Sequence, residues 1–413
     1  MPLPGLLCAA VAAGCLAMPA PAAPQVDVTA QRGAPVIGGW FGNWHPPETV
    51  AQKVKDGRGV LTDVAIFGWQ FAGRSRPVCA LTFHSGCVPA SAKRPYESAE
   101  LAASWSELGD VRTWVSHIDL DAARSGQLAG VLRHNSRRRD LIATLVTWTV
   151  DLGADGLDLD WESFAYHDGS GSWRRTRPAF VATIRQLAAA LHKKDRMLSV
   201  TVPAGAQPFT ADGRPRSGSG YWVYDWGAIA DSVDRLNLMT YDYSWDRPGP
   251  IGPNPWARQV VRSAIVQMGR DNAHKIVVGV PLYGKSWPTP GVGGRPRTIG
   301  KCPAAWRPDS SADLFSVTAA DARALAREHG TRPRLDRRTG EYTFRYGERA
   351  SGRVKRGART RTCTLSRTVW FSSGKALVKR AQMARDEGIG GVYAWNLAGT
   401  DRGMYRSYQR AIG

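Results

Sequence analysis

Short apolar runs alternate along the chain with longer segments in which apolar residues recur at helical spacing. Phe180, Ile184 and Leu187 show this spacing in one segment. Lys375–Glu387 is a further helix candidate, and Gly388 would end it. Near-continuous apolar strands are typical of a parallel sheet with both faces covered, and eight of them can close a barrel. The eight runs are Val36–Trp44, Leu61–Phe71, Val111–Asp119, Gly156–Trp161, Leu198–Pro203, Leu236–Tyr243, Ile276–Tyr283 and Gly391–Leu397.

The alternation of strands and helices predicts an α/β fold, a (β/α)8 TIM barrel over residues 35–413. One interval breaks the alternation. Within residues 285–369, Gly/Pro-rich stretches surround a helix candidate at Ala319–His329 and hairpin-like pieces around Asp336–Arg345. We predict that this interval is a small α+β insertion between the seventh strand and its helix. The basic stretch Ala350–Thr362 is expected to be a solvated loop.

The first residues have the composition of an export signal. Residues 1–24 contain a short apolar stretch followed by small residues, with Ala20-Pro21-Ala22 as a candidate cleavage site. We therefore predict a signal peptide over 1–24 and a secreted protein. No other stretch reaches the length of a membrane span, so no membrane association is expected beyond this segment.

Cysteine usage agrees with export. Of the 6 cysteines, four lie beyond residue 24: Cys79, Cys87, Cys302 and Cys363. An even number in an exported chain suggests two disulfides. Local pairing, Cys79 with Cys87 and Cys302 with Cys363, is the simplest of the possible connectivities. Because no Cys-x-x-Cys spacing is present, a zinc site is not expected.

Charge and aromatic content narrow the choice of partner. The chain has 55 Lys and Arg against 35 Asp and Glu, a formal charge of +20. Such a surface attracts polyanions, and an anionic cell-wall polymer is one candidate partner. The basic residues are scattered and no aromatic-interleaved basic motif appears, which argues against a nucleic-acid function. The 16 Trp suit carbohydrate binding, because a flat apolar ring stacks on the C–H face of a sugar.

One strand carries a row of carboxylates. Side chains alternate along a strand, so Asp158, Asp160 and Glu162 project from the same side and the apolar residues between them face the other way. Neighbouring carboxylates raise one another's pKa, which suits a site where one carboxyl must hold a proton near neutral pH. Glu162 ends the strand at the rim where barrel enzymes place their chemistry. The row lacks the turn glycine and spacing of a calcium loop, so no metal is expected.

Residues 155–162 read Asp-Gly-Leu-Asp-Leu-Asp-Trp-Glu. This segment resembles the Asp-x-x-Asp-x-Asp-x-Glu signature of glycoside hydrolase family 18, the chitinases and their relatives. Three further segments are similar to the family's sixth, seventh and eighth strands, and the family's insertion domain also follows the seventh. The resemblance covers roughly residues 35–412. The three segments are Met239-Thr240-Tyr241-Asp242, Val280-Pro281-Leu282-Tyr283-Gly284 and Tyr393-Ala394-Trp395.

The resemblance implies a retaining glycosidase without an enzyme nucleophile, in which the substrate's 2-acetamido oxygen attacks the anomeric carbon. Glu162 would protonate the leaving oxygen and then activate water. Asp160 would hold the acetamido N–H, Asp158 would share a proton with it, and Tyr241 would donate to the acetamido carbonyl. No cofactor is implied. The implied substrate-binding residues are Asp242, Trp395, Tyr283 and Met239.

The third strand departs from the family pattern. The family usually carries Ser-x-Gly-Gly there, whereas this chain reads Ser116-His117-Ile118-Asp119. Asp119 is expected either to contact substrate or to make a buried structural hydrogen bond.

Three functions are compatible with these residues. The first is hydrolysis of β-1,4-linked N-acetylglucosamine polymers, with chitin as the leading substrate. The basic surface and the altered third strand support a peptidoglycan-directed N-acetylglucosaminidase as the second. The third is a non-catalytic chitin-binding lectin. Lectins of this family have typically lost the acid glutamate, so the presence of Glu162, Asp160 and Tyr241 favours an enzyme.

Overall fold

The computed structural model describes residues 35–74, 77–80, 88–89, 108–119, 127–205, 210, 220–309, 313–355 and 359–412. The signal peptide predicted over residues 1–24 lies outside the described residues, and so does Cys87. No helix in the described part of the chain is long and apolar enough to cross a membrane.

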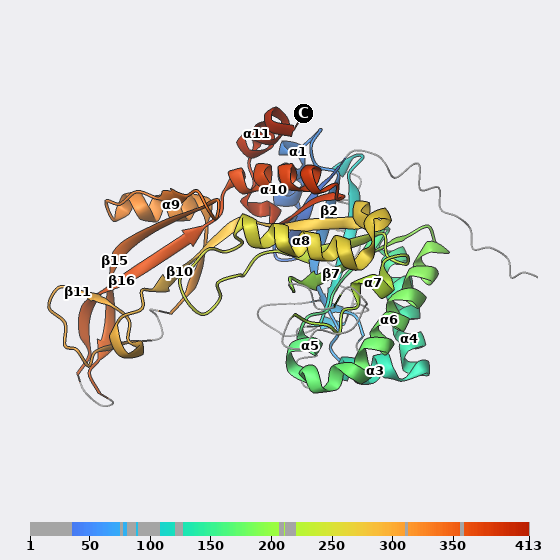
Figure 1. Ribbon diagram of the computed structural model, residues 1–413, viewed down its shortest axis with the longest axis horizontal. Coiled ribbons are helices and arrows are strands. Elements are labelled where there is room, and N and C mark those ends of the chain that lie inside the picture. The colour runs from blue at the N-terminus through green and yellow to red at the C-terminus, as the bar shows by residue number, and fades with distance from the viewer. Residues whose placement is uncertain are drawn as a thin grey trace, which may run out of the picture. The chain divides into compact units, whose positions relative to one another are not determined.

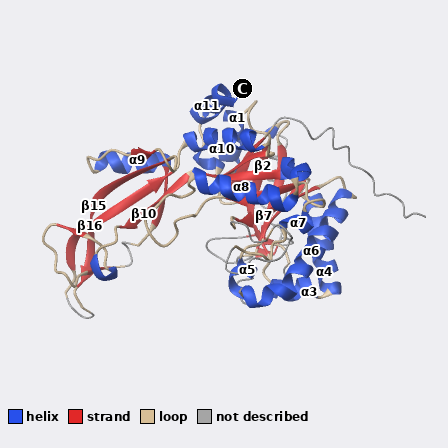
Figure 2. Ribbon diagram, viewed as in Figure 1, coloured by secondary structure: helices blue, strands red, loops and turns tan. Residues whose placement is uncertain are grey.

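Eight parallel strands close into a barrel, as predicted. Each strand pairs with two neighbours, and β1 pairs with β2 to complete the ring. Figure 2 shows these strands with helices around them. In barrel order the strands are β1 (Val36–Gly42), β17 (Gly391–Trp395), β9 (Ile276–Pro281), β8 (Arg235–Met239), β7 (Met197–Pro203), β6 (Gly156–Asp160), β5 (Arg112–Ile118) and β2 (Asp63–Gln70).

Helices between the strands pack apolar stripes against the outside of the barrel, so that strand and helix residues form one large core. Two short strands, β3 (Cys79–Ala80) and β4 (Val88–Pro89), extend the sheet from β2. The helices are α1 (Pro47–Asp56), α3 (Gln127–Arg133), α4 (Asn135–Asp151), α5 (Ser163–Asp168), α6 (Ser170–His192), α7 (Trp226–Ile229), α8 (Asn254–Met268), α10 (Gly374–Glu387) and α11 (Arg402–Ile412), with the 3₁₀ turns η3 (Arg270–Lys275) and η6 (Leu397–Gly399).

Every predicted apolar run overlaps a barrel strand, but several runs were predicted too long, the sixth by the most. β8 ends at Met239, not at Tyr243. The physical reason is a tight turn directly after Met239, in which the Thr240 N–H donates to the Leu238 carbonyl at 2.8 Å. Asp242, whose φ of 53° lies in the left-handed region, also cannot continue a strand. The predicted end of α10 is confirmed, because Gly388 adopts the left-handed conformation directly after Glu387.

A buried ion pair connects two strands at their amino-terminal ends. Asp63, the first residue of β2, accepts a hydrogen bond from Arg235, the first residue of β8, at 2.8 Å. The Trp114 indole and Arg112, both on β5, also donate to Asp63, at 2.8 and 3.0 Å. Burial alone would raise the pKa of Asp63, but Arg235 and Arg112 lower it to about 2. This pair fills the barrel below the carboxylate row.

The insertion follows β9 and contains a seven-stranded antiparallel sheet. α9 (Ala319–Glu328) packs on one face of this sheet, where Ala322 and Ala326 meet Phe344 and Val369 (Figure 1). The strands are β10 (Tyr283–Pro288), β11 (Thr298–Ile299), β12 (Arg307–Pro308), β13 (Phe315–Thr318), β14 (Arg334–Asp336), β15 (Glu341–Arg353) and β16 (Arg361–Phe371), and a 3₁₀ turn η4 covers Val292–Gly294.

The loop predicted over Ala350–Thr362 is wrong at both ends. β15 continues to Arg353 and β16 begins at Arg361, with Ala350 directly opposite Cys363 in the ladder. The ladder extends this far because small apolar residues alternate with exposed arginines, and the apolar side is buried against Trp306.

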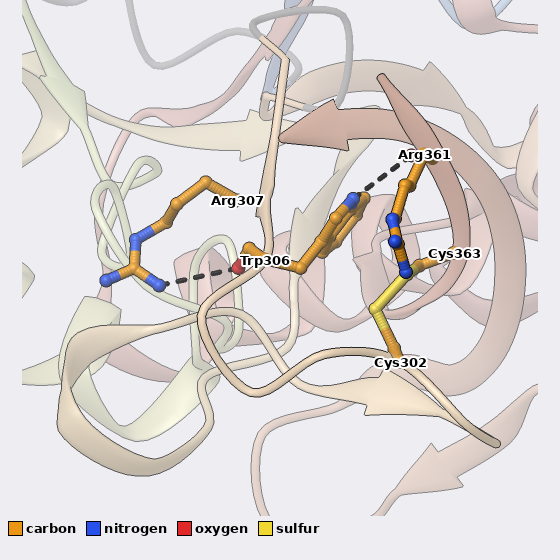
Figure 3. Close-up of a disulfide and its surroundings, with 5 residues drawn as sticks. All are labelled: Cys302, Trp306, Arg307, Arg361 and Cys363. Atoms are coloured by element: carbon orange, nitrogen blue, oxygen red, sulfur yellow. Dashed lines mark hydrogen bonds between the residues drawn. A yellow bond between two sulfur atoms is a disulfide. The ribbon is translucent and has the colours of Figure 1, made fainter. Parts of the chain in front are cut away.

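A disulfide anchors this hairpin. Cys302 and Cys363 are bridged, with their Cα atoms 5.9 Å apart, which confirms the predicted pair (Figure 3). The buried Trp306 lies beside the bridge and its indole N–H donates to the Arg361 carbonyl at 3.1 Å. Cys79 is also disulfide-bonded; Cys87, its predicted partner, is outside the described residues.

Candidate active site

Strand β6 turns its carboxylates into the barrel. Asp158 and Asp160 are buried in the interior, whereas Leu157, Leu159 and Trp161 pack in the core between strands and helices. The predicted alternation is therefore confirmed for Asp158 and Asp160. The prediction that Glu162 ends the strand is wrong, because β6 ends at Asp160 and the backbone of Glu162 already has helical torsions at the start of α5. β6 is one of the strands of a closed parallel barrel. Its carboxyl end therefore lies at the rim where barrel enzymes bind their substrates.

Asp158 is held by four donors from four different strands. Its Oδ2 accepts from the Trp40 indole at 3.0 Å and from the Ser116 hydroxyl at 2.8 Å. Its Oδ1 accepts from the Thr201 hydroxyl at 2.8 Å and from the Asn237 amide at 3.4 Å. These contacts match the acceptor-only character of a carboxylate and fix its position.

Asp160 is buried, and its Oδ1 has no hydrogen-bond partner among the described residues. Burial raises its pKa well above the usual range, and the charges of Glu162, Asp158 and Asp119 add to that effect. Asp160 therefore favours its protonated form. A buried polar atom without a partner is costly, so its presence here marks a place where a substrate group can bind.

Glu162 lies two residues after the end of β6 and immediately before the first residue of α5. Its Oε2 accepts a hydrogen bond from the Tyr166 hydroxyl at 2.9 Å. Burial raises the pKa of Glu162 to about 7; the Tyr166 hydrogen bond opposes the rise, and Asp119 and Asp242 add to it. A carboxyl with this pKa can donate a proton and later accept one at neutral pH.

Asp119 makes structural hydrogen bonds. It directly follows β5, is 1% exposed, and accepts backbone N–H bonds from Glu162, Ser163 and Phe164. Of the two expectations for Asp119, the buried structural hydrogen bond is confirmed.

The residues after β8 lie beside the carboxylates. Burial raises the pKa of Tyr241 well above its usual range, with Asp160 as the next cause, so the hydroxyl stays protonated next to that carboxyl. Asp242 accepts a hydrogen bond from the Tyr283 hydroxyl at 2.6 Å and is also bound by the Lys285 ammonium. Met239 ends β8 and is buried. The structure thus brings the predicted β8 and β10 residues to one rim.

Aromatic side chains line the same end of the barrel. Trp395, the last residue of β17, contacts Phe67 edge to face with ring centroids 4.8 Å apart. Its ring centroid is 6.0 Å from that of Trp40, which donates to Asp158. Trp245 is 62% exposed, and the Lys285 ammonium lies 3.9 Å from its ring centroid. These rings provide flat apolar surfaces of the kind on which sugars stack.

Several of these residues were not identified from the sequence: Trp40, Thr201, Asn237, Tyr166, Trp245 and Lys285. For Thr201 and Asn237 a signal was available, because both are polar residues at inward positions of otherwise apolar runs. Among the described residues, no group of three or more His, Cys, Asp and Glu side chains is arranged to hold a metal ion.

A carboxyl group with a pKa of about 7, beyond the carboxyl end of a barrel strand and beside a second carboxyl whose pKa is raised, is typical of an acid–base enzyme. Residues 121–401 match the sequence pattern of the glycosyl hydrolases family 18. The chain belongs to this family and is a glycosidase, a hydrolase of glycosidic bonds.

The chain is similar to both bacterial glycosylases and chitinases. The uncharacterized glycosylase YvbX of Bacillus subtilis (strain 168) is 20% identical over 317 residues, which cover 76% of each chain. The Bacillus cereus spore cortex-lytic enzyme SleL has a similar structure, with a TM-score of 0.66 at 19% identity over 92% of this chain and 75% of that one. A chitinase from Chromobacterium violaceum ATCC 12472 gives a TM-score of 0.66 at 21% identity, covering 92% and 99%.

Proposed function

We propose that the protein cleaves β-1,4-linked N-acetylglucosamine polymers, with chitin as the leading substrate, by a substrate-assisted retaining mechanism. One observation carries this proposal: the carboxyl beside Glu162 is the buried Asp160, whose pKa is raised and whose Oδ1 is unpartnered. An enzyme nucleophile must be ionised to attack, whereas a buried, protonated carboxyl is suited to hydrogen bonding. The substrate's own acetamido oxygen then takes the place of the nucleophile.

In the first step, the Glu162 carboxyl donates its proton to the leaving glycosidic oxygen as the C1–O bond breaks. The acetamido oxygen forms the new bond to C1 and gives an oxazolinium ion. Asp160 passes its proton to Asp158, accepts a hydrogen bond from the acetamido N–H and, as a carboxylate, stabilises the positive charge of the ring. Tyr241 donates its hydroxyl to the acetamido group.

In the second step, the Glu162 carboxylate accepts a proton from water, and the water oxygen attacks C1. The C1–O bond of the oxazolinium ring breaks, and the product keeps the configuration of the substrate. The Glu162 pKa of about 7 allows the same group to act as acid first and base second.

Peptidoglycan is a second candidate substrate, and two observations favour it. The chain carries a formal charge of +20, which attracts anionic wall polymers, and it resembles a spore cortex-lytic enzyme in structure. Both polymers offer the N-acetyl group that the mechanism needs, so the catalytic residues alone do not discriminate between them. We also propose export, on the strength of the leader-like residues 1–24 and the disulfide-bonded Cys302 and Cys363.

The test is to incubate the purified protein with chitin oligomers, with their N-deacetylated forms and with peptidoglycan, and to identify the products. We expect cleavage of the acetylated oligomers and none of the fully deacetylated ones, because these lack the attacking oxygen. Sugar release from peptidoglycan alone would replace chitin by the second candidate. Equal cleavage of acetylated and deacetylated oligomers would overturn the mechanism.

A further inference from the structure

The turn that carries Glu162 is held from the neighbouring strand. Asp119, which follows β5, accepts three consecutive backbone N–H bonds: Oδ1 from Glu162 and Ser163 at 2.8 Å each, and Oδ2 from Phe164 at 2.7 Å. Hydrogen bonds to an ionised acceptor are stronger than neutral ones. The three donors form the connection between β6 and α5, so one carboxylate defines the backbone of this connection.

Helix α5 does not define this connection by itself. It covers only Ser163–Asp168, and a helix of this length is not stable in isolation. At its start, Glu162 makes no side-chain capping bond. The first N–H groups of α5, those of Ser163 and Phe164, have no acceptor within the helix. Asp119, which follows the neighbouring strand β5, accepts their hydrogen bonds instead.

Strand β5 also binds Trp161, the residue before Glu162, through the side chain of His117. The Trp161 indole N–H donates to Nδ1 of His117 at 2.9 Å, and therefore the proton of His117 lies on Nε2, which donates to the Pro77 carbonyl at 2.8 Å. Burial lowers the pKa of His117 to about 4, so the ring stays neutral and this arrangement persists at physiological pH. β5 thus fixes both Trp161 and the backbone of Glu162.

We propose that Asp119 is a positioning residue for the glycosidase reaction, which places the Glu162 carboxyl by holding the backbone N–H groups of residues 162–164. This inference rests on the proposed role of Glu162. Displacement of a reacting group by about 1 Å costs on the order of 100-fold in rate, so an anchor of the turn has a direct effect on kcat. Asp119 stands where the family usually has the second glycine of its third-strand motif, a residue that offers no acceptor side chain.

The charge of Asp119 gives the proposal a second readout. Burial raises the pKa of Asp119 to about 6 against the lowering effect of its backbone hydrogen bonds, so it is ionised above that pH. Its negative charge then lies close enough to Glu162 to contribute to the raised pKa of that group. The other titratable groups facing Glu162 are Asp160 on β6, Tyr166 on α5, Tyr221 and Tyr224 before α7, and Tyr241 and Asp242 after β8. Asp119→Asn leaves these residues in place and removes one negative charge. Because that charge also adds to the raised pKa of Asp160 and of Tyr224, the pH profile reports its loss at Glu162 and Asp160 together.

Asp119→Asn is the test variant. The amide keeps one acceptor oxygen for two of the N–H groups but presents an NH₂ to the third and removes the charge. Asp155→Asn is the matched control, because Asp155 also ties β6 to β5, accepting the Thr113 backbone N–H at 2.8 Å and its hydroxyl at 2.9 Å, at the opposite end of the strands. Both variants are assayed on an N-acetylglucosamine oligomer together with wild type and Glu162→Gln.

We expect Asp119→Asn to lower kcat by about 10- to 100-fold with KM changed less than about threefold. The alkaline limb of its kcat/KM profile should move to lower pH by about one unit, since the pKa of Glu162 falls when the neighbouring charge is removed. Asp155→Asn should change the melting temperature without moving that limb. If Asp119→Asn does not fold, Asp119→Ser supplies a short neutral acceptor and carries the same expectations.

An Asp119→Asn protein whose kcat and alkaline limb match those of Asp155→Asn would overturn the proposal. The accompanying variants keep this outcome separate from failure of the proposed function. Active wild type with inactive Glu162→Gln and normal Asp119→Asn refutes only the positioning role. Active Glu162→Gln refutes the function on which it rests.

Discussion

The hydroxyl of Tyr166 donates a hydrogen bond to Oε2 of Glu162 at 2.9 Å. Tyr166 lies one helical turn after Glu162 in the chain. A donor to the ionised form of a carboxyl stabilises that form, so Tyr166 partly offsets the burial that raises the pKa of Glu162 to about 7. The pKa of Glu162 therefore lies near neutrality because burial, which raises it, is partly opposed by the hydrogen bond from Tyr166, which lowers it.

Tyr166→Phe should therefore raise the pKa of Glu162. One hydrogen bond contributes about 0.5–1.5 kcal/mol and one pH unit corresponds to about 1.4 kcal/mol, so the alkaline limb of kcat/KM should move up by about half to one unit. Tyr221→Phe is the control, because the Tyr221 ring contacts that of Tyr166, with centroids 4.9 Å apart, and its hydroxyl does not bond Glu162. An unshifted limb in Tyr166→Phe, or an equal shift in both variants, would contradict this account.

Asp160→Asn should lower kcat by about 10²–10³ with a smaller change in KM. The proposed task of Asp160 is to stabilise charge that develops along the reaction path, and removal of such a group affects the transition state more than the bound substrate. Steady-state kinetics on an N-acetylglucosamine oligomer provide the measurement. A raised KM with an unchanged kcat would assign Asp160 to substrate binding instead.

The same variant should be more stable than wild type at neutral pH. The folded-state pKa of Asp160 is raised above its unfolded value, so its contribution to stability is present below about pH 4 and is lost as the pH rises through the folded pKa. An asparagine carries no such penalty. The melting temperature of Asp160→Asn relative to wild type should thus increase from pH 4 to pH 7. A difference that is constant with pH would show that Asp160 is not destabilised by ionisation.

Removal of the insertion's disulfide should destabilise the protein without abolishing catalysis. Cys302 and Cys363 are 61 residues apart, and closing a loop of that length contributes about 4 kcal/mol of loop-closure entropy. The double variant Cys302→Ala/Cys363→Ala should lower the melting temperature, as reduction of wild type should. Its kcat at 25 °C should remain within about threefold, because the bridge lies on β16 and the segment before β12, not among the carboxylates. Unchanged thermal stability would contradict the expectation.

Periodicity made much of the barrel and its central motif predictable. The eight buried strands read as apolar runs because helices cover their outer faces, and the carboxylate row of β6 followed from simple alternation. Positions that depend on backbone torsion were not predictable in this way: β8 stops at Met239 because the chain turns at Thr240, and Asp242 then adopts a positive φ. The length of the β15–β16 hairpin was also missed, since exposed arginines alternate there with small buried residues and the stretch reads as a charged loop.

The surroundings of the carboxylates were the least predictable part. The donors to Asp158 come from β1, β5, β7 and β8, which are far apart in sequence and meet only when the barrel closes. The role of Asp119 was left open between two alternatives, because only the three-dimensional register of β5 and β6 brings it to the Glu162 turn. A contact of this kind depends on strand pairing, which the sequence pattern of one strand does not contain.

The central claim is that Glu162 is the proton donor of the reaction, and the kcat of Glu162→Gln on a chitin oligomer tests it most directly. Glutamine fills nearly the same space but has no proton to donate at this position, so kcat should fall by about 10²–10⁴ or more. The melting temperature should stay within a few degrees of wild type, which shows that the fold is intact. A folded Glu162→Gln protein with near wild-type kcat would contradict the account.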